Sequence, residues 1–421
     1  MTNSEGQCRA ASRFPSTRPF LAMLTLELSF AAAAAGALPD TAPHYVGSQA
    51  CQPCHAAIYN RWKQTRMANV VRDPRVDPQA FLCDFSKPNT FFTFRKSDIA
   101  FVYGSHWKQR YFVKRGNDYF VLPVQWDIVR QRWEKYHPHP GDDWWVPDYP
   151  DSQMQRPTGP LCDGCHSVNY DVKTKTVTEW NVGCERCHGP GSEHIQAPWN
   201  FRHNIVNPAR LDFVRANDDC IQCHSQLRPL ANPIQGVYYD WAVGYKPGDR
   251  LSNVVRLENQ RLGVHDFFYW PDGSAQKNRM QGNDFVTSAM YEHGVTCFDC
   301  HDPHGTDNKD LLIKPGSQMC LECHGPNSPN GPRGSLEEHT HHQAGSPGSS
   351  CLDCHMPRID IQVDSFSVRS HTFRFISPAL TIQYGIPNPC TSCHKHKTNQ
   401  WALDQLHQWQ NVSPWRLERR N

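Results

Sequence analysis

The residues best suited to do chemistry in this chain belong to one pentapeptide, Cys-x-x-Cys-His, which occurs eight times. In c-type haem attachment each cysteine bonds to one vinyl group and the adjacent histidine ligates the iron. Zinc ribbons and iron–sulfur sites also use paired cysteines, but neither requires a histidine directly after the second cysteine. The motif therefore predicts eight covalent haem c groups, attached at Cys51, Cys54, Cys162, Cys165, Cys184, Cys187, Cys220, Cys223, Cys297, Cys300, Cys320, Cys323, Cys351, Cys354, Cys390 and Cys393.

Each motif also supplies one axial iron ligand: His55, His166, His188, His224, His301, His324, His355 and His394. The opposite face of each iron takes a second histidine, a methionine, another donor or water, and this choice separates electron carriers from enzymes. Positions just after or before a motif favour four histidines as distal ligands: His194, His304, His342 and His371. Surface exposure or a hydrogen bond to a haem propionate is the alternative role for each of them.

Other histidines are weaker candidates for distal ligands: His339, His106, His203, His265 and His293. Met67 is a further predicted ligand, because it lies on a helix expected over 56–72 and a thioether would raise the potential of its haem. The alternative is that Met67 packs in the apolar face of this helix beside Trp62 and Val70.

The elements that hold these ligands cannot rest on a conventional core. Only 38% of the 421 residues are hydrophobic, and the chain contains 33 Pro and 26 Gly. Porphyrins are large apolar bodies that a thin polypeptide can wrap, so the haems are expected to form most of the core. We expect a mainly α chain with extensive loops, a multihaem cytochrome c fold organised around eight covalent haems, and a small antiparallel β insertion.

The order of segments follows from the motif spacing. We expect a first haem segment over 45–75, a β-rich insertion over 80–150, a seven-haem core over 155–400, and a C-terminal helix and tail over 401–421. The insertion is predicted from aromatic and β-branched stretches between 91 and 136, interrupted by turn residues at Gly116-Asn117-Asp118.

The N-terminus is typical of a secretory signal. Arginines precede an apolar run over 20–30, and Ala35-Gly36-Ala37 fits a cleavage site, so residues 1–37 are expected to be a signal peptide. A retained anchor is the alternative. The protein is then periplasmic or extracellular, and the mature chain is expected to have no membrane span. The net charge of +2 without a basic cluster argues against nucleic acid as a partner, and the oligomeric state is left open.

Several pieces of the chain resemble a known family. CxxCHGPGSEH, GVTCFDCHDPHG and the HTHH-to-CHMP stretch resemble the multihaem cytochromes grouped with cytochrome c-554. More distantly, the chain is similar to the superfamily of hydroxylamine oxidoreductase, octahaem tetrathionate reductase and pentahaem nitrite reductase. The resemblance implies a largely helical, haem-packed fold with distal ligands at His194, His304, His342 and His371. No Cys-x-x-Cys-Lys motif occurs, so the lysine-ligated haem of the nitrite reductases has no counterpart.

Two functions are consistent with these features. The first is electron transfer between redox partner proteins through closely spaced haems. The alternative is an octahaem oxidoreductase that reduces a small nitrogen or sulfur oxyanion at one open-site haem. The basic stretches HWKQRY at 106–111 and QKNRMQ at 276–281 could line such a site, although solvated strand and loop faces explain them equally well.

Overall fold

The computed structural model describes residues 42–87, 94–136, 157–200, 202, 204–325, 327–360, 367–410, 412 and 417. The expected signal peptide at 1–37, residues 137–150 of the expected β insertion, and His203 lie outside them. The described residues from Pro43 onward group into one unit.

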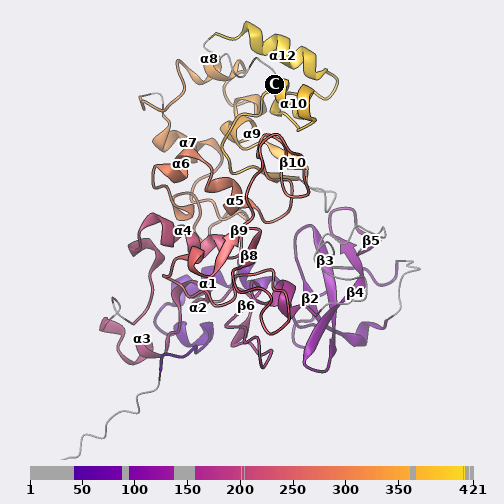
Figure 1. Ribbon diagram of the computed structural model, residues 1–421, viewed down its shortest axis with the longest axis vertical. Helices are drawn as coiled ribbons and strands as arrows, with labels where there is room; N and C mark the ends of the chain where they lie inside the picture. Colours follow the sequence, from indigo (N-terminus) through magenta and orange to yellow (C-terminus); the bar gives the residue numbers. More distant parts are fainter. Residues whose placement is uncertain are drawn as a thin grey trace, which may run out of the picture. The chain divides into compact units, whose positions relative to one another are not determined.

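A five-stranded antiparallel sheet follows the first motif (Figure 1). Its strands pair in sequence order: β1 Val71–Arg72, β2 Ile99–Tyr103, β3 Lys108–Arg115, β4 Asp118–Asp127 and β5 Arg132–Lys135. A tight turn at Gly116, where φ is +60°, joins the two longest strands, as the turn residues predict. Because β1 belongs to the segment that carries the first motif, the sheet joins the β insertion to that segment.

Both faces of this sheet are buried. One face forms a local core with residues of the preceding loop, namely Ala80, Ile99, Val102, Tyr111, Leu122, Val124, Trp126 and Trp133. The other face presents Val71, Phe101, Tyr103 and Phe112, which pack against Cys162 and Trp180. Because successive side chains of a strand point to opposite faces, one face of the sheet packs against the second Cys-x-x-Cys-His motif.

Three two-stranded antiparallel ribbons begin one to three residues after the histidines of motifs 2, 4 and 7. They pair β6 Ser167–Val168 with β7 Glu179–Trp180, β8 Leu227–Pro229 with β9 Val255–Leu257, and β10 Arg358–Asp360 with β11 Ser367–Arg369. The fold is therefore richer in small sheets than the mainly α expectation.

The helices are short. They are α1 Ala56–Trp62, α2 Glu185–His188, α3 Ser192–Gln196, α4 Phe213–Ile221, α5 Gln281–Phe285, α6 Ala289–Glu292, α7 Ser317–Cys323, α8 Leu336–Thr340, α9 Cys351–His355, α10 Pro378–Tyr384, α11 Pro389–Cys393 and α12 Asn399–Gln408. The helix expected over 56–72 ends at Trp62, and Met67–Asn69 forms a separate 3-10 turn before β1. The C-terminal helix α12 begins two residues before the expected boundary at 401.

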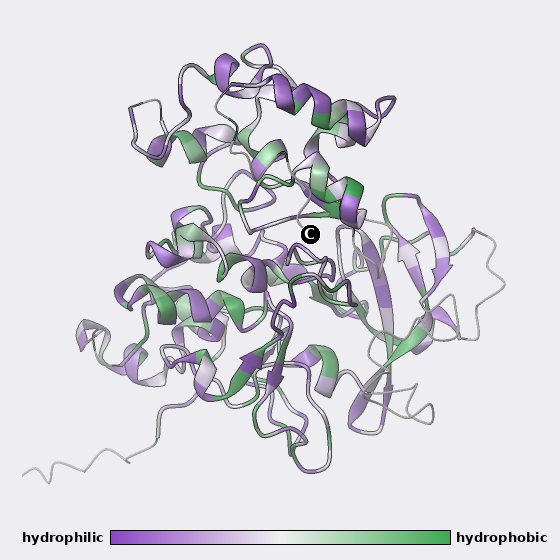
Figure 2. Ribbon diagram, turned by 45° about the horizontal axis from the view of Figure 1, so that its top comes forward, coloured by the Kyte–Doolittle hydropathy of each residue, from purple (hydrophilic) through white to green (hydrophobic). Residues whose placement is uncertain are grey.

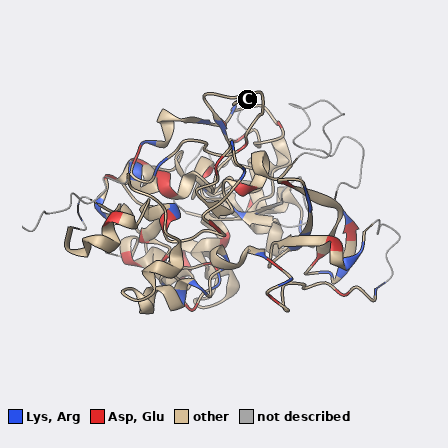
Figure 3. Cartoon of the chain, turned by 90° about the horizontal axis from the view of Figure 1, so that it is seen from below, with Lys and Arg blue, Asp and Glu red and all other residues tan. Residues whose placement is uncertain are grey.

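Hydrophobic side chains gather in small clusters and not in one core. Outside the sheet, each described cluster holds at most five buried side chains, the largest being Ile221, Leu227, Ala242, Leu251 and Val255. Figure 2 shows hydrophobic and hydrophilic residues interleaved along the elements, and Figure 3 shows acidic and basic residues intermixed. Among the described helices, none has the length and apolarity needed to cross a membrane.

Candidate functional site

The eight Cys-x-x-Cys-His motifs share one local conformation. In seven of them the backbone N–H of the histidine donates to the carbonyl of the first cysteine at 2.8–3.1 Å. The remaining one, motif 7, forms helix α9. A single helical turn places residues i and i+3 on one face, so both cysteines point the same way and the histidine follows. The motif cysteines form no disulfide with one another. Each motif is therefore preshaped for two thioether bonds and one iron ligand.

Four of the motif histidines face a second histidine at nearly the same distance. The ring centroids are 6.1–6.2 Å apart in every pair, and the ring planes differ by 8–33°. All four pairs join histidines that are well separated in sequence: His55 with His194, His188 with His304, His355 with His339, and His394 with His342.

This separation is the one expected for two imidazoles on opposite sides of one metal ion. A metal–imidazole bond is about 2.0 Å and a ring nitrogen lies about 1.1 Å from the ring centre, so the two centroids would be about 6.2 Å apart. Directly stacked aromatic rings can approach more closely. The four pairs therefore fit axial coordination of a haem iron between them.

Six candidate ligand rings, three of them from these pairs, are oriented by a hydrogen bond at Nδ1. The acceptors are backbone carbonyls for five histidines and the Asp302 carboxylate for His304: His188 to Val206 at 2.7 Å, His301 to Asp310 at 2.8 Å, His324 to Asn330 at 2.9 Å, His342 to Thr340 at 2.5 Å, His371 to Arg369 at 3.0 Å, and His304 at 3.1 Å. An Nδ1–H donor leaves Nε2 with its lone pair, which is the usual arrangement of metal-ligating histidines.

His339, a weaker ligand candidate from the sequence, faces a motif histidine in the structure. It lies in the same loop as His341 and His342, and only His342 was favoured as a ligand. Helix α8 carries His339 toward His355 and ends at Thr340, and the next residue, His341, reverses the chain with a φ of +54°. That reversal turns His342 toward His394 and leaves His341 stacked on Trp409 at 4.2 Å. The left-handed residue after this short helix is what separates the directions of His339 and His342.

His371 has a different environment from the four pairs. It is half-buried, and burial, together with the charges of His301 and His224, lowers its pKa to about 4. Its backbone N–H and the Ser370 hydroxyl both donate to the carboxylate of Asp284, at 2.9 and 3.0 Å. His371 is therefore a fixed, neutral imidazole close to two motif histidines, which is the state that binds metals.

Glu185, inside the third motif, holds the first His–His pair in place. Its buried carboxylate accepts N–H donors from Val46 at 3.0 Å and from Gly47 and Gly191 at 2.7 Å. Val46 and Gly47 precede the first motif, and Gly191 ends the turn before helix α3, which carries His194. One carboxylate thus ties together the two segments whose histidines form the His55–His194 pair.

The second motif is surrounded differently. Burial, together with the charges of Arg279, His224 and Arg110, lowers the pKa of His166 to about 4. Among the described residues no second histidine ring faces His166 at 6 Å. The ring of Tyr103 lies edge-on to His166 with centroids 5.6 Å apart, and its hydroxyl donates to Asp163 of the motif at 2.8 Å. The basic stretches at 106–111 and 276–281 therefore both reach this motif.

The remaining candidates are not brought opposite a motif histidine in the described structure. His265 stacks on Trp270 at 4.5 Å, and His106 lies against Trp107 at 4.4 Å. The carbonyl of Met67 accepts from Val182 at 3.1 Å, but the position of Met67 in a 3-10 turn does not identify a haem for its sulfur, so its role as a ligand stays a prediction.

Motifs that are distant in sequence touch through their cysteines. The thiols of four cysteine pairs lie close enough to shift each other's pKa: Cys51–Cys184, Cys165–Cys223, Cys220–Cys297 and Cys320–Cys351, which brings motifs 1 and 3, 2 and 4, 4 and 5, and 6 and 7 together. Electrostatic proximity further links motif 5 to 6 and motif 7 to 8, through Cys300–Cys323 and Cys354–Cys390. Haems attached at these cysteines would be near neighbours. The paired histidines and preshaped motifs fit haem c.

Two protein-family models match segments of the chain that contain these motifs. Residues 148–189 match the family model described as cytochrome c554 and c-prime, and residues 290–329 match the doubled CXXCH motif. These segments contain motifs 2 and 3 and motifs 5 and 6. The two family models thus recognise the same pentapeptides that fold into preshaped turns.

Relatives are distant in sequence. The dissimilatory sulfite reductase MccA of Wolinella succinogenes is 20% identical over 411 residues, covering 74% of this chain and 50% of the relative. The multiheme cytochrome MtrA of Shewanella baltica is 23% identical over 169 residues, covering 39% of this chain and 47% of the relative. The chain thus spans about half the length of these curated relatives.

A solved structure shares the fold. The crystal structure of the outer cell wall cytochrome OcwA superposes with a TM-score of 0.69 at 22% identity, covering 87% of each chain. The fold expected from the resemblance is therefore confirmed in its coarse form, with short helices and several small antiparallel sheets. This chain is a multihaem c-type cytochrome that binds haem c covalently through CXXCH motifs and carries a cytochrome c554-type segment.

Proposed function

We propose that this protein is an exported octahaem cytochrome that transfers electrons between redox partner proteins. The observation that carries the proposal is the set of four His–His pairs at 6.1–6.2 Å, because iron with two strong axial imidazoles has no position left for a substrate. Eight complete motifs supply one attachment site each. The protein's part is then to space, orient and electrostatically tune the haems.

The contacts between cysteines support a path for the electrons. They run from motif 1 to motif 3, and from motif 4 through motifs 5, 6 and 7 to motif 8, while motif 2 touches motif 4. The charge of Cys223 also acts on Cys187, which connects motifs 3 and 4. We infer a continuous row of seven haems with the second haem as a side branch.

The location of partner sites follows from exposure. Cys54, Cys323 and Cys393 are exposed, so the haems of motifs 1, 6 and 8 are the ones that redox proteins would reach. Export is proposed from residues 1–37, and the outer cell wall location named for OcwA is consistent with it.

Intact mass measurement tests the stoichiometry. Protein exported by a host with a c-type haem attachment system should have the mass of the cleaved polypeptide plus eight haems. A fully loaded product with fewer haems, or one whose metal is mainly zinc, would contradict the proposal.

A reductase acting on a small sulfur or nitrogen oxyanion is the second candidate, and the surroundings of His166 favour it. Arg110 and Arg279 lie near this histidine, and no histidine faces it among the described residues. Cationic side chains beside an open iron could bind an anion and stabilise its charge. The relative MccA is named a sulfite reductase.

Electron paramagnetic resonance of the oxidised protein separates the two candidates. A high-spin ferric signal that shifts on addition of sulfite or nitrite, and that no longer shifts in Arg279→Gln, would favour the reductase. Uniformly low-spin iron that is indifferent to both anions would favour the carrier.

A further inference from the structure

Helix α5 connects the fourth motif to the loop that carries His371. On one side of the helix, the N–H of Gly282 donates to the carbonyl of His224, the histidine of motif 4, at 2.7 Å. A Cβ atom at Gly282 would lie only 3.0 Å from this carbonyl oxygen, so a glycine suits the close approach. The next residue, Asn283, exchanges two hydrogen bonds with the backbone of Gln226, at 2.8 and 3.0 Å. The helix is therefore fixed to the backbone of motif 4 and of the residues that follow it.

The other contact of α5, with the loop of His371, depends on one carboxylate. Asp284 is 3% exposed, and its two oxygens accept three hydrogen bonds. The N–H of His371 and the hydroxyl of Ser370 donate to Oδ2 at 2.9 and 3.0 Å. The N–H of Ala275 donates to Oδ1 at 2.9 Å. Hydrogen bonds to a carboxylate are among the stronger ones in proteins, so Asp284 fixes the backbone position of His371.

The ring of His371 is oriented by a separate contact. Its Nδ1 lies 3.0 Å from the carbonyl oxygen of Arg369, and the guanidinium of Arg369 donates to the carbonyl of Leu352 in motif 7 at 2.9 Å. His301 and His224 are motif histidines whose charges act on His371. The imidazole is thus held between motif 7 and helix α5, near the histidines of motifs 4 and 5.

We propose that Asp284 is a positioning residue for iron ligation, which holds His371 as the distal ligand of the haem of motif 4 or of motif 5. The inference rests on the haem content proposed above. The carboxylate binds the backbone N–H of His371 and leaves the ring free to bind a metal. Groups outside the ligand set that fix the orientation of a ligand are commonly needed for full metal binding.

The experiment compares Asp284→Asn with His371→Ala and with the double variant, all in haem-loaded protein. Asparagine has nearly the size of aspartate but one acceptor oxygen in place of two, so it cannot serve the donors on both sides of the carboxylate. Intact mass gives the haem content first, because a shortage of haem in the parent contradicts the octahaem proposal and not this one. Electron paramagnetic resonance and optical spectra of the oxidised proteins then measure the amount of high-spin iron.

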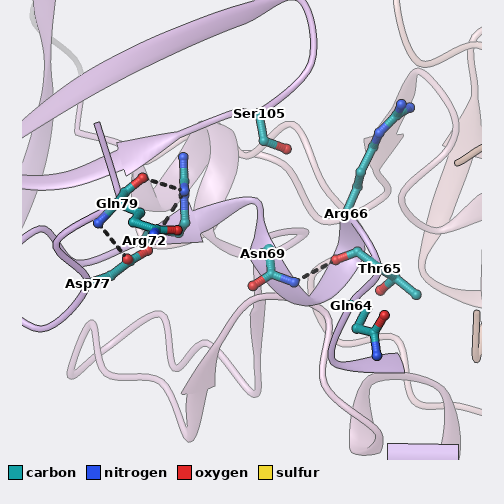
Figure 4. A pocket seen from close by; sticks show the side chains of 8 residues that line it. All are labelled: Gln64, Thr65, Arg66, Asn69, Arg72, Asp77, Gln79 and Ser105. Carbon is teal, nitrogen blue, oxygen red and sulfur yellow. Dashed lines mark hydrogen bonds and ion pairs between the residues drawn. The ribbon is translucent and has the colours of Figure 1, made fainter. Parts of the chain in front are cut away.

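Asp77→Asn is the matched control. Asp77 also accepts a backbone N–H, that of Gln79 at 2.9 Å, and it lies at a polar cavity that Arg72 also lines (Figure 4). It belongs to a loop, residues 73–80, that contains no histidine or methionine. This variant removes a carboxylate that accepts a backbone N–H without disturbing a loop that carries a candidate ligand, so its spectra should match those of the parent.

The expected change is confined to one haem. His371→Ala should convert one low-spin haem per chain to high spin, and Asp284→Asn should convert part of the same haem. The double variant should contain no more high-spin iron than His371→Ala, because the two residues act through one ligand. Imidazole added to His371→Ala should restore the low-spin spectrum. A structural role alone would lower the stability of Asp284→Asn without this selective change.

Three results would overturn the proposal. Parent-like spectra of Asp284→Asn would show that Asp284 does not position a ligand. More high-spin iron in the double variant than in His371→Ala would show that Asp284 acts on another haem. Parent-like spectra of His371→Ala would remove His371 from the ligand set, even if all eight haems are attached.

Asp284→Glu decides the matter if Asp284→Asn does not fold. It keeps the charge and both acceptor oxygens but moves them by the length of one methylene group. The same partial conversion of one haem is then expected, and a parent-like spectrum of this variant would overturn the proposal.

Discussion

His188 of motif 3 and His304, which follows motif 5, face one another with ring centroids 6.1 Å apart and ring planes 13° apart. Each ring is held at Nδ1, by the Val206 carbonyl and by the Asp302 carboxylate. Two imidazoles fixed from behind at this separation fit two ligands of one iron. The same separation recurs in three further pairs, so ligation is directly testable.

The spin state of one haem should depend on His339. In His339→Ala the iron bound by His355 loses its second imidazole, so one low-spin ferric haem becomes high spin while all haems remain attached through their cysteines. Optical spectroscopy and electron paramagnetic resonance measure this change. His341→Ala is the matched control, because His341 is in the same loop but stacks on Trp409. Equal spectra of both variants and the parent would remove His339 from the ligand set.

The carboxylate of Glu185 should contribute strongly to stability. Glu185→Ala leaves one buried and two half-buried backbone N–H groups without their acceptor, and each such loss costs about 1–3 kcal/mol, so the free energy of unfolding should fall by roughly 3–5 kcal/mol. Glu185→Gln keeps one acceptor oxygen and should cost less. Denaturant titration of haem-loaded protein measures this, with the exposed Glu193→Ala as control. A smaller loss in unfolding free energy than in the control would show that Glu185 does not hold these segments together.

Lys277 should make stability depend on pH in the alkaline range. Burial, together with the charge of Arg279, lowers its pKa to about 7, whereas the unfolded chain keeps the usual value of 10.5. Between these values the unfolded state binds more protons, so the free energy of unfolding rises as pH increases from about 7 toward 10. Calorimetric melting at several pH values should show this rise, and Lys277→Met should remove it. The exposed Lys246→Met should retain the rise seen in the parent.

Met67 remains the sharpest untested ligand prediction. If its sulfur binds iron, the oxidised protein shows the weak near-infrared charge-transfer band of methionine-ligated haem, and Met67→His abolishes the band and lowers one midpoint potential. Met67→Leu separates this from packing, because it retains apolar volume while removing the sulfur. A parent protein without the band, and unchanged titrations in both variants, would assign Met67 to packing.

The sequence by itself determined the chemistry of the attachment sites. The Cys-x-x-Cys-His pattern is local, because its two cysteines and its histidine are brought together by a single helical turn. The longest strands of the sheet were equally readable, since alternation in β2, β3 and β4 and the turn at Gly116 are short-range features.

Only the tertiary structure decided which residues meet across a distance. His194 faces His55 because Glu185 ties their segments together, and His339 and His342 diverge because His341 adopts a left-handed conformation. Helix α1 ends at Trp62, where the indole donates to the Val182 carbonyl at 3.0 Å, so a long-range contact limits a pattern that locally favoured a longer helix. Pairings of this kind depend on long-range geometry that no local spacing encodes, and which histidine faces a given motif histidine is therefore a property of the fold.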